Sequence, residues 1–252
     1  MKSILVPRAR FLMLLAAGAL TGCSSIADAL TDNAAFRRLL IAPERLDLAI
    51  LGSGEPLARE YSESEISPDF RQNGFDPPSS PEYQTWARDD WRGYRLQIGG
   101  LVRVPRSFSL LELRSRFLSL SQITRHDCVE GWSVIGKWTG PRVADVIAAC
   151  GPLPQAKYVV FHCMDVDQNG TPYYESLDIR QAAHPQALLA YGLNDRPVPV
   201  KNGAPLRLKV PTQLGYKSAK YVSRIELVAS LGGKNGNGGY WEDQGYEWYA
   251  GI

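Results

Sequence analysis

Apolar and polar positions alternate along residues 94–100, which read YRLQIGG. A period of two residues is typical of a half-buried β-strand. Ser109 follows at a position suited to a helix N-cap, because its hydroxyl can accept a hydrogen bond from the first turn. Beyond it the apolar residues are spaced as on one face of a short helix: Leu110, Leu113 and Phe117. This part of the chain is therefore predicted to run from strand to helix.

Further patterns continue the mixture of helix and strand. Residues 142–150 predict a second amphipathic helix, which Gly151 and Pro152 end. Asn194 and Asp195 form a good hairpin turn. Apolar, β-prone runs predict strands at residues 157–163, 206–210 and 221–228, the last two separated by a turn at Gly215. The predicted fold class is α+β, with mostly antiparallel mixed sheets.

The first 22 residues have the features of an export signal. A basic start precedes an apolar run at residues 11–20, about half the length of a membrane-spanning helix. The run ends in Leu20-Thr-Gly-Cys23, which resembles the lipobox of bacterial lipoproteins. Residues 1–22 are therefore predicted to be a signal peptide, and Cys23 the lipidated residue that anchors the chain to a membrane.

Two further regions follow the leader. Residues 23–81 are irregular apart from one helical stretch at residues 33–50, and they are predicted to be a tether and N-terminal extension. Residues 82–252 are predicted to form one domain, which is long enough to bury a core.

The leader also predicts where the protein resides. A lipidated Cys23 predicts a cell-envelope lipoprotein that faces the periplasm, and Ser24 after it favours the outer over the inner membrane. Arg8 and Arg10 are separated by Ala9, a departure from a twin-arginine signal. Export by the twin-arginine and by the general secretory route both stay open.

Charge and composition exclude some classes of function. With 28 basic and 26 acidic residues the formal net charge is +2, so no global field would gather nucleic acid. The 3 histidines leave little scope for a histidine-rich metal site. The 4 cysteines contain neither a haem-attachment motif nor an iron–sulfur set.

Cys128 is the candidate reactive residue. It ends the alternating run 122–128, beside a glycine turn and close to Arg125 and His126. Nearby positive charge stabilises a thiolate, which is the form that binds metals. On this ground alone a buried structural cysteine is the commoner reading, because free cysteines are among the most buried residues.

Longer blocks of sequence resemble a known family. Arg125-His-Asp-Cys-Val-Glu-Gly-Trp-Ser133 is followed by Trp138-Thr-Gly140 and then by a core strand, Ala156-Lys-Tyr-Val-Val-Phe161. Asn202-Gly-Ala-Pro-Leu-Arg-Leu-Lys-Val-Pro211 and Leu214-Gly-Tyr-Lys-Ser-Ala-Lys220 complete the set. In this order the blocks resemble the sulfite oxidase superfamily, and most closely its bacterial methionine-sulfoxide-reductase-like branch of molybdopterin-dependent catalytic subunits.

The resemblance implies a cofactor, Mo-molybdopterin, one per chain, in a sulfite-oxidase-type fold. Cys128 would be the protein's ligand to the metal, and Arg125 a candidate catalytic residue. The planar donors of Arg207 suit a phosphate, and Lys217 and Lys220 add charge around the Gly215 turn. The predicted cofactor-binding residues are Asn73, Cys163, His184, Asn202, Arg207, Lys217, Ser218, Ala219 and Lys220. Asn73 as a turn residue and His184 as a structural hydrogen-bonder are the competing readings.

The function implied is a two-electron oxidoreductase of the cell envelope that acts on a small-molecule substrate. Oxygen-atom transfer is expected, as in a reductase of S- or N-oxides such as methionine sulfoxide. Electrons would be exchanged with an external donor or acceptor, a membrane haem protein or a cytochrome.

Three alternatives stay open. A sulfite-dehydrogenase-like oxidation would need cations beside Cys128, for which Arg125 is the candidate. A metal-free lipoprotein scaffold would not need both Cys128 and the 202–220 segment. Cysteine-nucleophile catalysis would need a base such as His126 or His184.

Several residues are left without a firm role. Asp127 and Glu130 are expected to be solvated neighbours of the turn. Cys150 is expected in the core, and a disulfide between Cys150 and Cys163 is left open. The aromatic residues of the tail 239–249 are expected to cover the core and to lie near the entrance of the site.

Overall fold

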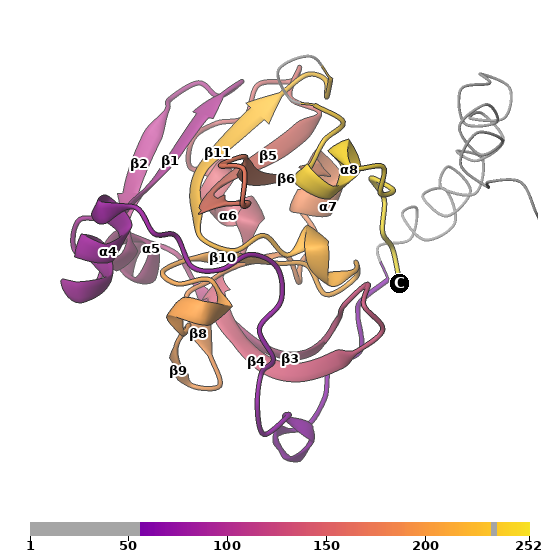
Figure 1. Ribbon diagram of the computed structural model, residues 1–252. Helices are drawn as coiled ribbons and strands as arrows, with labels where there is room; N and C mark the ends of the chain where they lie inside the picture. Colours follow the sequence, from indigo (N-terminus) through magenta and orange to yellow (C-terminus); the bar gives the residue numbers. More distant parts are fainter. Residues whose placement is uncertain (1–55, 233–235) are drawn as a thin grey trace, which may run out of the picture. The chain divides into compact units, whose positions relative to one another are not determined.

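The computed structural model describes residues 56–232 and 236–252 (Figure 1). The predicted signal peptide, the lipidated Cys23, the helical stretch 33–50 and most of the predicted tether lie outside the described residues. The boundaries proposed at residues 22 and 81 stay predictions. No helix among the described residues is long and apolar enough to cross a membrane.

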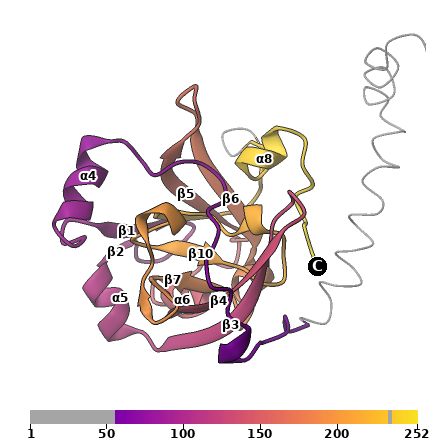
Figure 2. The ribbon, with the colours of Figure 1, turned by 60° about the horizontal axis from the view of Figure 1, so that its bottom comes forward.

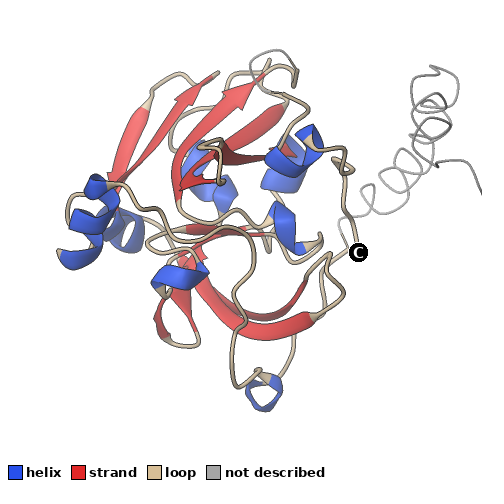
Figure 3. Ribbon diagram, in the orientation of Figure 1, coloured by secondary structure: helices blue, strands red, loops and turns tan. Residues whose placement is uncertain are grey.

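The largest sheet has five strands (Figure 3). In spatial order they are β2 (Arg106–Ser109), β1 (Arg95–Gly100), β11 (Val222–Val228), β5 (Tyr158–Val166) and β6 (Pro172–Asp178). β1 and β11 are parallel, and the other neighbours are antiparallel. The fold is thus α+β with mostly antiparallel sheets, as predicted.

Two smaller sheets complete the β-structure of the described residues. The four-stranded sheet has the order β3 (Ser119–Asp127), β4 (Ser133–Pro141), β8 (Gly192–Leu193) and β9 (Arg196–Pro197). The other pairs β10 (Arg207–Lys209) with β7 (Leu188–Ala190). In Figures 1 and 2, β10 lies between the five-stranded sheet and the β3–β4 ribbon.

The helices are short, and several are capped by side chains. Within residues 56–232 and 236–252 the α-helices are α4 (Pro81–Arg88), α5 (Leu110–Arg116), α6 (Val143–Ala148), α7 (Ile179–Ala182) and α8 (Tyr240–Asp243). The 3₁₀ turns are η1 (Glu63–Glu65), η2 (Val200–Asn202) and η3 (Gly215–Lys217). Ser109 caps α5 by accepting a hydrogen bond from the Glu112 backbone N–H, which confirms its predicted role.

Most predicted elements are present. Both amphipathic helices and the strands at 94–100, 157–163, 206–210 and 221–228 are confirmed within a few residues. Asn194 and Asp195 form the β8–β9 turn with φ of 51° and 59°. The strands β4 and β6 were not predicted, because their apolar and polar residues do not alternate regularly.

Two buried apolar clusters hold the domain together. The larger lies against the five-stranded sheet and includes Leu96, Phe161 and Ile225, with Val143 and Val146 contributed by α6. The smaller cluster consists of Phe70, Val134, Trp138, Leu188, Ala190, Leu193 and Val198. Its residues come from β4, β7 and β8 and from the chain around Phe70 and Val198.

The described part of the N-terminal extension lies along the domain. The Tyr61 backbone N–H donates to the Ile123 carbonyl at 2.9 Å, and that of Ser67 to the Ile135 carbonyl at 3.0 Å. The Phe70 side chain is buried and meets the Trp138 ring edge-on, with centroids 5.0 Å apart. These contacts bring the segment that follows, around Asn73, to the candidate site.

Candidate functional site

Cys128 lies at the exit of β3, in the turn that leads to β4. Its backbone N–H donates to the Trp132 carbonyl at 2.9 Å, and the Gly131 N–H donates back to the Cys128 carbonyl at 3.0 Å. Gly131 has φ +85°, a conformation that favours glycine. The turn leaves the Cys128 thiol half-buried, at the wall of a cavity of about 280 Å³.

Six separate parts of the chain meet around this cavity. Its lining residues are Asn73, Gly74, Phe75, Cys128, Val129, Glu130, Asp165, Tyr173, Gly215, Tyr216, Ser218, Ala219, Lys220, Trp241 and Tyr246. Five of the residues predicted from the sequence are among them: Asn73, Cys128, Ser218, Ala219 and Lys220. The fold therefore brings Cys128 together with the 218–220 segment, some 90 residues away in sequence.

Arg207 is held directly behind the lining. Its side chain is fully buried and donates to the backbone carbonyls of Asn202 and Ser218, both at 2.9 Å. The guanidinium lies over the Trp138 ring, 5.0 Å from the centroid. Its Nε has no hydrogen-bond partner among the described residues. Burial lowers the pKa of Arg207 to about 10, so the group stays charged at neutral pH.

Two buried lysines add to this positive charge. The Lys220 Nζ donates to the Phe75 carbonyl at 2.6 Å, and the Lys209 Nζ donates to the Arg125 carbonyl at 2.9 Å. Burial, followed by repulsion from Arg207, lowers the pKa of Lys220 to about 8 and that of Lys209 to about 7. The lowered values mean that nearby carboxylates do not offset the cost of burying these charges. An anion bound in the cavity would offset that cost.

Asp165 is a buried acid at the same cavity, and nothing in the sequence singled it out. Burial raises its pKa to about 7 in spite of the attraction of Lys220 and Arg207. Its Oδ1 has no hydrogen-bond partner within the described part of the chain. The carboxyl therefore carries its proton for part of the time at neutral pH.

The thiol of Cys128 has little cationic support from its sequence neighbours. Burial raises its pKa, and the Glu130 backbone N–H opposes that shift. His126 is buried, and burial holds its pKa well below the ordinary value, so its ring is neutral. The expected contribution of His126 charge is therefore wrong, because the ring points inward, near Phe70 and Trp132.

Arg125 turns away from the cavity. Its guanidinium pairs with Asp127 at 2.7 Å and is half exposed, and it does not line the cavity. Its assignment as a catalytic residue stays a prediction. Glu130, expected to be merely solvated, lines the cavity and accepts a hydrogen bond from the Trp132 indole N–H at 2.8 Å.

The remaining predicted residues lie behind or beside the lining. Asn202 is buried and donates to the Phe70 carbonyl at 3.3 Å. Cys163 is buried next to the charged cluster, and burial raises its pKa well above the ordinary value. Cys150 and Cys163 are both free thiols. His184 accepts at Nδ1 from the Gln186 N–H at 3.2 Å, in a contact typical of a structural histidine.

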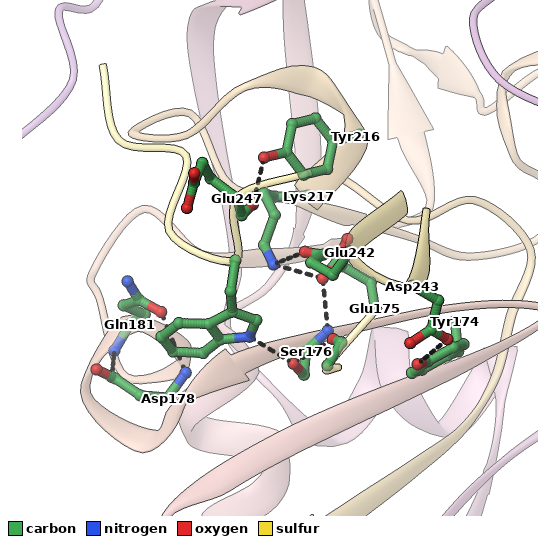
Figure 4. Close-up of polar contacts among 12 residues, drawn as sticks. Tyr174, Glu175, Ser176, Asp178, Gln181, Tyr216, Lys217, Glu242, Asp243 and Glu247 are labelled. Carbon is green, nitrogen blue, oxygen red and sulfur yellow. Dashed lines mark hydrogen bonds and ion pairs between the residues drawn. The ribbon is translucent and has the colours of Figure 1, made fainter. Parts of the chain in front are cut away.

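Lys217 is directed away from the cavity. Its Nζ lies 2.5 Å from a Glu175 carboxylate oxygen and 2.6 Å from one of Glu242, and all three side chains are buried (Figure 4). The charge of Lys217 is thereby committed to these acids. Its proposed contact with a cofactor stays a prediction.

The aromatic residues of the lining come from four parts of the chain: Phe75, Tyr173, Tyr216, and Trp241 with Tyr246. Phe75 precedes α4, and Trp241 and Tyr246 belong to the C-terminal segment. The tail was expected near the entrance because of its many aromatic residues, and the lining confirms this. Phe75 and Tyr173 gave no comparable signal, since isolated aromatic residues are most often core.

The chain is similar to known proteins over much of its length. The sequence model of the family described as "Oxidoreductase molybdopterin binding domain" matches residues 83–232. The putative protein-methionine-sulfoxide reductase subunit YedZ1 of Azospira oryzae is 36% identical over 235 residues, which cover 92% of this chain and 81% of the relative.

Other relatives match over a shorter stretch. The protein-methionine-sulfoxide reductase catalytic subunit MsrP of Xanthomonas axonopodis pv. citri is 40% identical over 147 residues, 55% of this chain and 46% of the relative. The match thus spans about half the length of MsrP. The sulfane dehydrogenase SoxCD from Paracoccus pantotrophus aligns in structure with a TM-score of 0.49 and 22% identity, over 54% of this chain and 38% of that one.

Proposed function

Because the chain belongs to the oxidoreductase molybdopterin-binding domain family, we propose that it is the catalytic subunit of a cell-envelope reductase of methionine sulfoxide or a related S- or N-oxide. As a member of this family it is an oxidoreductase that carries molybdopterin. In this proposal Cys128 is the ligand to the molybdenum. Relatives named as methionine-sulfoxide reductase subunits support the direction and substrate class.

One observation carries the proposal. The Cys128 thiol and the Ser218–Lys220 segment line the same cavity, and the buried Arg207 guanidinium stands directly behind that segment. A soft thiolate beside a cationic recess suits a cofactor with a metal at one end and a phosphate at the other.

The unsatisfied polar atoms of the site fit this group. The Asn73 Oδ1, the Asp165 Oδ1 and the Arg207 Nε are buried without a hydrogen-bond partner among residues 56–232 and 236–252. Buried polar atoms are rarely left unpaired, so such a cluster indicates a ligand with complementary donors and acceptors. A pterin offers ring N–H groups and a phosphate offers acceptor oxygens.

The chain's own residues divide the work of binding and proton supply. When bound, the molybdenum cofactor supplies the two-electron redox chemistry. Arg207 and Lys220 would neutralise its phosphate, and Ser218 can add a hydroxyl donor. Reduction of a sulfoxide to a sulfide and water consumes two protons. Glu130 and Asp165 place carboxyl groups at the cavity, and Asp165, with a pKa of about 7, can hold a proton at its free Oδ1.

Two other readings are less well supported. A sulfite-dehydrogenase-like site would bring Arg125 to Cys128, but Arg125 pairs with Asp127 outside the lining. A metal-free scaffold offers no reason for the buried charge of Arg207, Lys209 and Lys220.

We further propose that Cys23 anchors the protein as a periplasm-facing lipoprotein, with the outer membrane favoured, and that a membrane haem protein or a cytochrome exchanges its electrons. The basis is the lipobox-like Leu20-Thr-Gly-Cys23 and the lack of haem or iron–sulfur motifs in the sequence. Membrane fractionation of the wild type and Cys23→Ala tests the anchor. A variant that stays with the membrane as the wild type does would contradict it.

Elemental analysis tests the central proposal. Protein from a host that makes the molybdenum cofactor is expected to contain about one molybdenum per wild-type chain, and Cys128→Ala little or none, because the metal loses its protein ligand. Cys150→Ala, which changes a buried cysteine outside the cavity lining, is the matched control and should keep its metal. A folded wild type that contains neither molybdenum nor pterin would overturn the proposal.

A further inference from the structure

A buried ion triad joins the candidate site to the C-terminal segment, residues 236–252. Lys217 belongs to η3, next to the lining residue Ser218, and Glu242 belongs to α8. Glu175 completes the triad from β6. The three side chains are 0%, 1% and 0% exposed. Figure 4 shows the Lys217 ammonium in contact with both carboxyl groups, which lie next to each other.

The charges of the triad are unequal, since one cation faces two acids. Burial raises the pKa of Glu175 well above its ordinary value. A proton on Glu175 would leave Lys217 and Glu242 as a neutral pair. Removal of the Lys217 charge would leave two acids facing each other without a cation, which is costly in a buried site.

Polar contacts around the triad secure the same segment. The Tyr216 hydroxyl donates to the Glu247 carbonyl at 2.6 Å, and the Trp248 indole N–H donates to the Ser176 Oγ at 2.8 Å. At the end of the chain, the Leu214 N–H donates to the Ala250 carbonyl at 2.9 Å. The segment is therefore hydrogen-bonded both to the chain around η3, which carries Lys217, and to β6, which carries Glu175.

What the triad holds in place is an aromatic wall. Trp241, adjacent to Glu242, and Tyr246 line the cavity that contains the Cys128 thiol. Their rings are stacked, with centroids 5.2 Å apart and an interplanar angle of 29°. Phe75 extends the wall, with its centroid 6.3 Å from that of Trp241.

The two rings of the wall carry no charge, and the described segment 236–252 contains neither lysine nor arginine. Its acids do not line the cavity: Glu242 is buried against Lys217, and Asp243 accepts a hydrogen bond from the Tyr174 hydroxyl. The carboxyl group of Glu130 does belong to the lining. Two uncharged rings near this carboxyl group favour a neutral molecule with an apolar substituent over a small anion. Aromatic rings also make favourable contacts with sulfur.

We propose that Trp241 and Tyr246 form the specificity-determining wall for a neutral sulfoxide with an apolar substituent, and that Lys217 is the positioning residue that holds this wall through Glu242 and Glu175. The part that concerns the substrate rests on the proposed function. The part that concerns Lys217 does not depend on it.

Hydrogen exchange followed by mass spectrometry tests the positioning role without any need for activity. In Lys217→Met, exchange in residues 236–252 should be on the order of a hundredfold faster than in the wild type, because a broken buried ion pair opens the segment locally. Exchange in β1 should be unchanged. Glu242→Gln preserves the shape of the side chain and is the more conservative change. It should accelerate exchange in residues 236–252 by a smaller factor. If Lys217→Met does not fold, Glu242→Gln decides whether the triad holds the segment. Gln244→Ala, an exposed position in the same segment, is the control and should exchange like the wild type.

Steady-state kinetics of the molybdenum-loaded protein test the wall. With methyl p-tolyl sulfoxide as substrate, Trp241→Ala, Tyr246→Ala and Glu242→Gln should raise KM about tenfold while kcat and molybdenum content stay near those of the wild type. With dimethyl sulfoxide, which offers less apolar surface, the increase in KM should be smaller.

The outcomes separate the two parts of the inference. Unchanged exchange of residues 236–252 in both triad variants would overturn the role of Lys217. An unchanged KM in Trp241→Ala and Tyr246→Ala would overturn the role of the wall. A fully loaded wild type that reduces no sulfoxide would overturn the proposed function and the substrate class with it, whereas the exchange result would still decide the role of Lys217.

Discussion

Arg207 shows how a single side chain can organise the site. Its guanidinium ties η2 to the 218–220 segment through the carbonyls of Asn202 and Ser218, and it keeps one donor, Nε, without a partner among the described residues. A planar group with several fixed donors can serve two backbone carbonyls and a bound anion at once. A lysine has the charge but not this geometry.

Arg207→Lys is therefore expected to weaken both the fold and cofactor retention. Loss of two charge-assisted hydrogen bonds should lower the free energy of unfolding by about 2–4 kcal/mol. Pterin content, measured by fluorescence after release, should fall well below that of the wild type. Arg92→Lys, at an exposed arginine, is the control for both measurements. Wild-type pterin content in a folded Arg207→Lys would contradict the assignment.

Asp165 and Lys217 show two ways in which the sequence fails to predict the role of a single residue. Asp165 was not singled out, and Lys217 was singled out for a different contact. Asp165 has no motif around it, and only the fold reveals that it is a buried acid at the cavity. Lys217 lies in a cation-rich stretch that suits an anion, yet its partners Glu175 and Glu242 are 42 and 25 positions away. Local composition carries no information about such distant partners.

At the scale of elements, the close approach of β4 and β7 helps to position Trp138, which packs against Arg207. Gly140 in β4 lies against the Leu189 backbone, so that a Cβ added there would be 2.0 Å from the Leu189 carbonyl oxygen. Both partners are backbone atoms of strands, which cannot move aside as a flexible side chain can. Trp138, two residues earlier, is fully buried under Arg207.

Gly140→Ala is expected to destabilise the domain by about 3 kcal/mol or more, because one extra methyl group forces the two strands apart. Chemical denaturation of the cofactor-free protein measures this. Gly99→Ala in β1 is the matched control, since its Cβ would meet no atom within 4 Å. Equal stability of the two variants would show that β4 and β7 can separate without cost.

Elements with a clear local pattern were predicted well. The capped helix α5, the helix α6 before Gly151, and β1 with its regular alternation are all specified by neighbouring residues. β4 and β6 were missed because their residue types do not follow their burial. In β4 buried positions alternate with less buried ones, but Gly136 and Gly140 occupy two of the buried positions and Ile135 a less buried one. In β6 the polar residues Glu175 and Ser176 are buried.

At the scale of the whole molecule, the buried cations make stability depend on pH. Burial lowers the pKa of Lys209 to about 7, against about 10.5 in an unfolded chain. Between these values the unfolded state binds more protons than the folded state, so this group makes the folded state more stable as pH rises. Below pH 7 both states carry the proton, and the full cost of burying the charge applies.

Lys209→Met is expected to show this dependence by its loss. In the cofactor-free protein, its stability relative to the wild type should decline by about 2 kcal/mol between pH 7 and pH 8.5, because the wild type gains stability over that range. Thermal or urea unfolding at each pH gives the difference. Lys137→Met is the control, since its ion pairs with Glu63 and Asp195 raise its pKa and it does not titrate in this range. A constant difference for Lys209→Met would contradict a Lys209 pKa that burial lowers to about 7.

The sequence by itself determined the features that a local pattern or motif can specify. These features are the strand that ends at Cys128, the segment that carries Ser218, Ala219 and Lys220, the helix caps, and the aromatic character of the tail. Each depends on neighbours within a few positions, where periodicity and capping chemistry act directly.

Only the tertiary structure decided which of these residues share a cavity. It directed Arg125 toward Asp127 and Lys217 toward Glu175 and Glu242, and it brought Asp165, Phe75 and Trp241 to the cavity that Cys128 also lines. The physical reason is burial: the cost of removing charges and aromatic rings from water depends on partners far away in the chain, and a local pattern of residues does not contain that information.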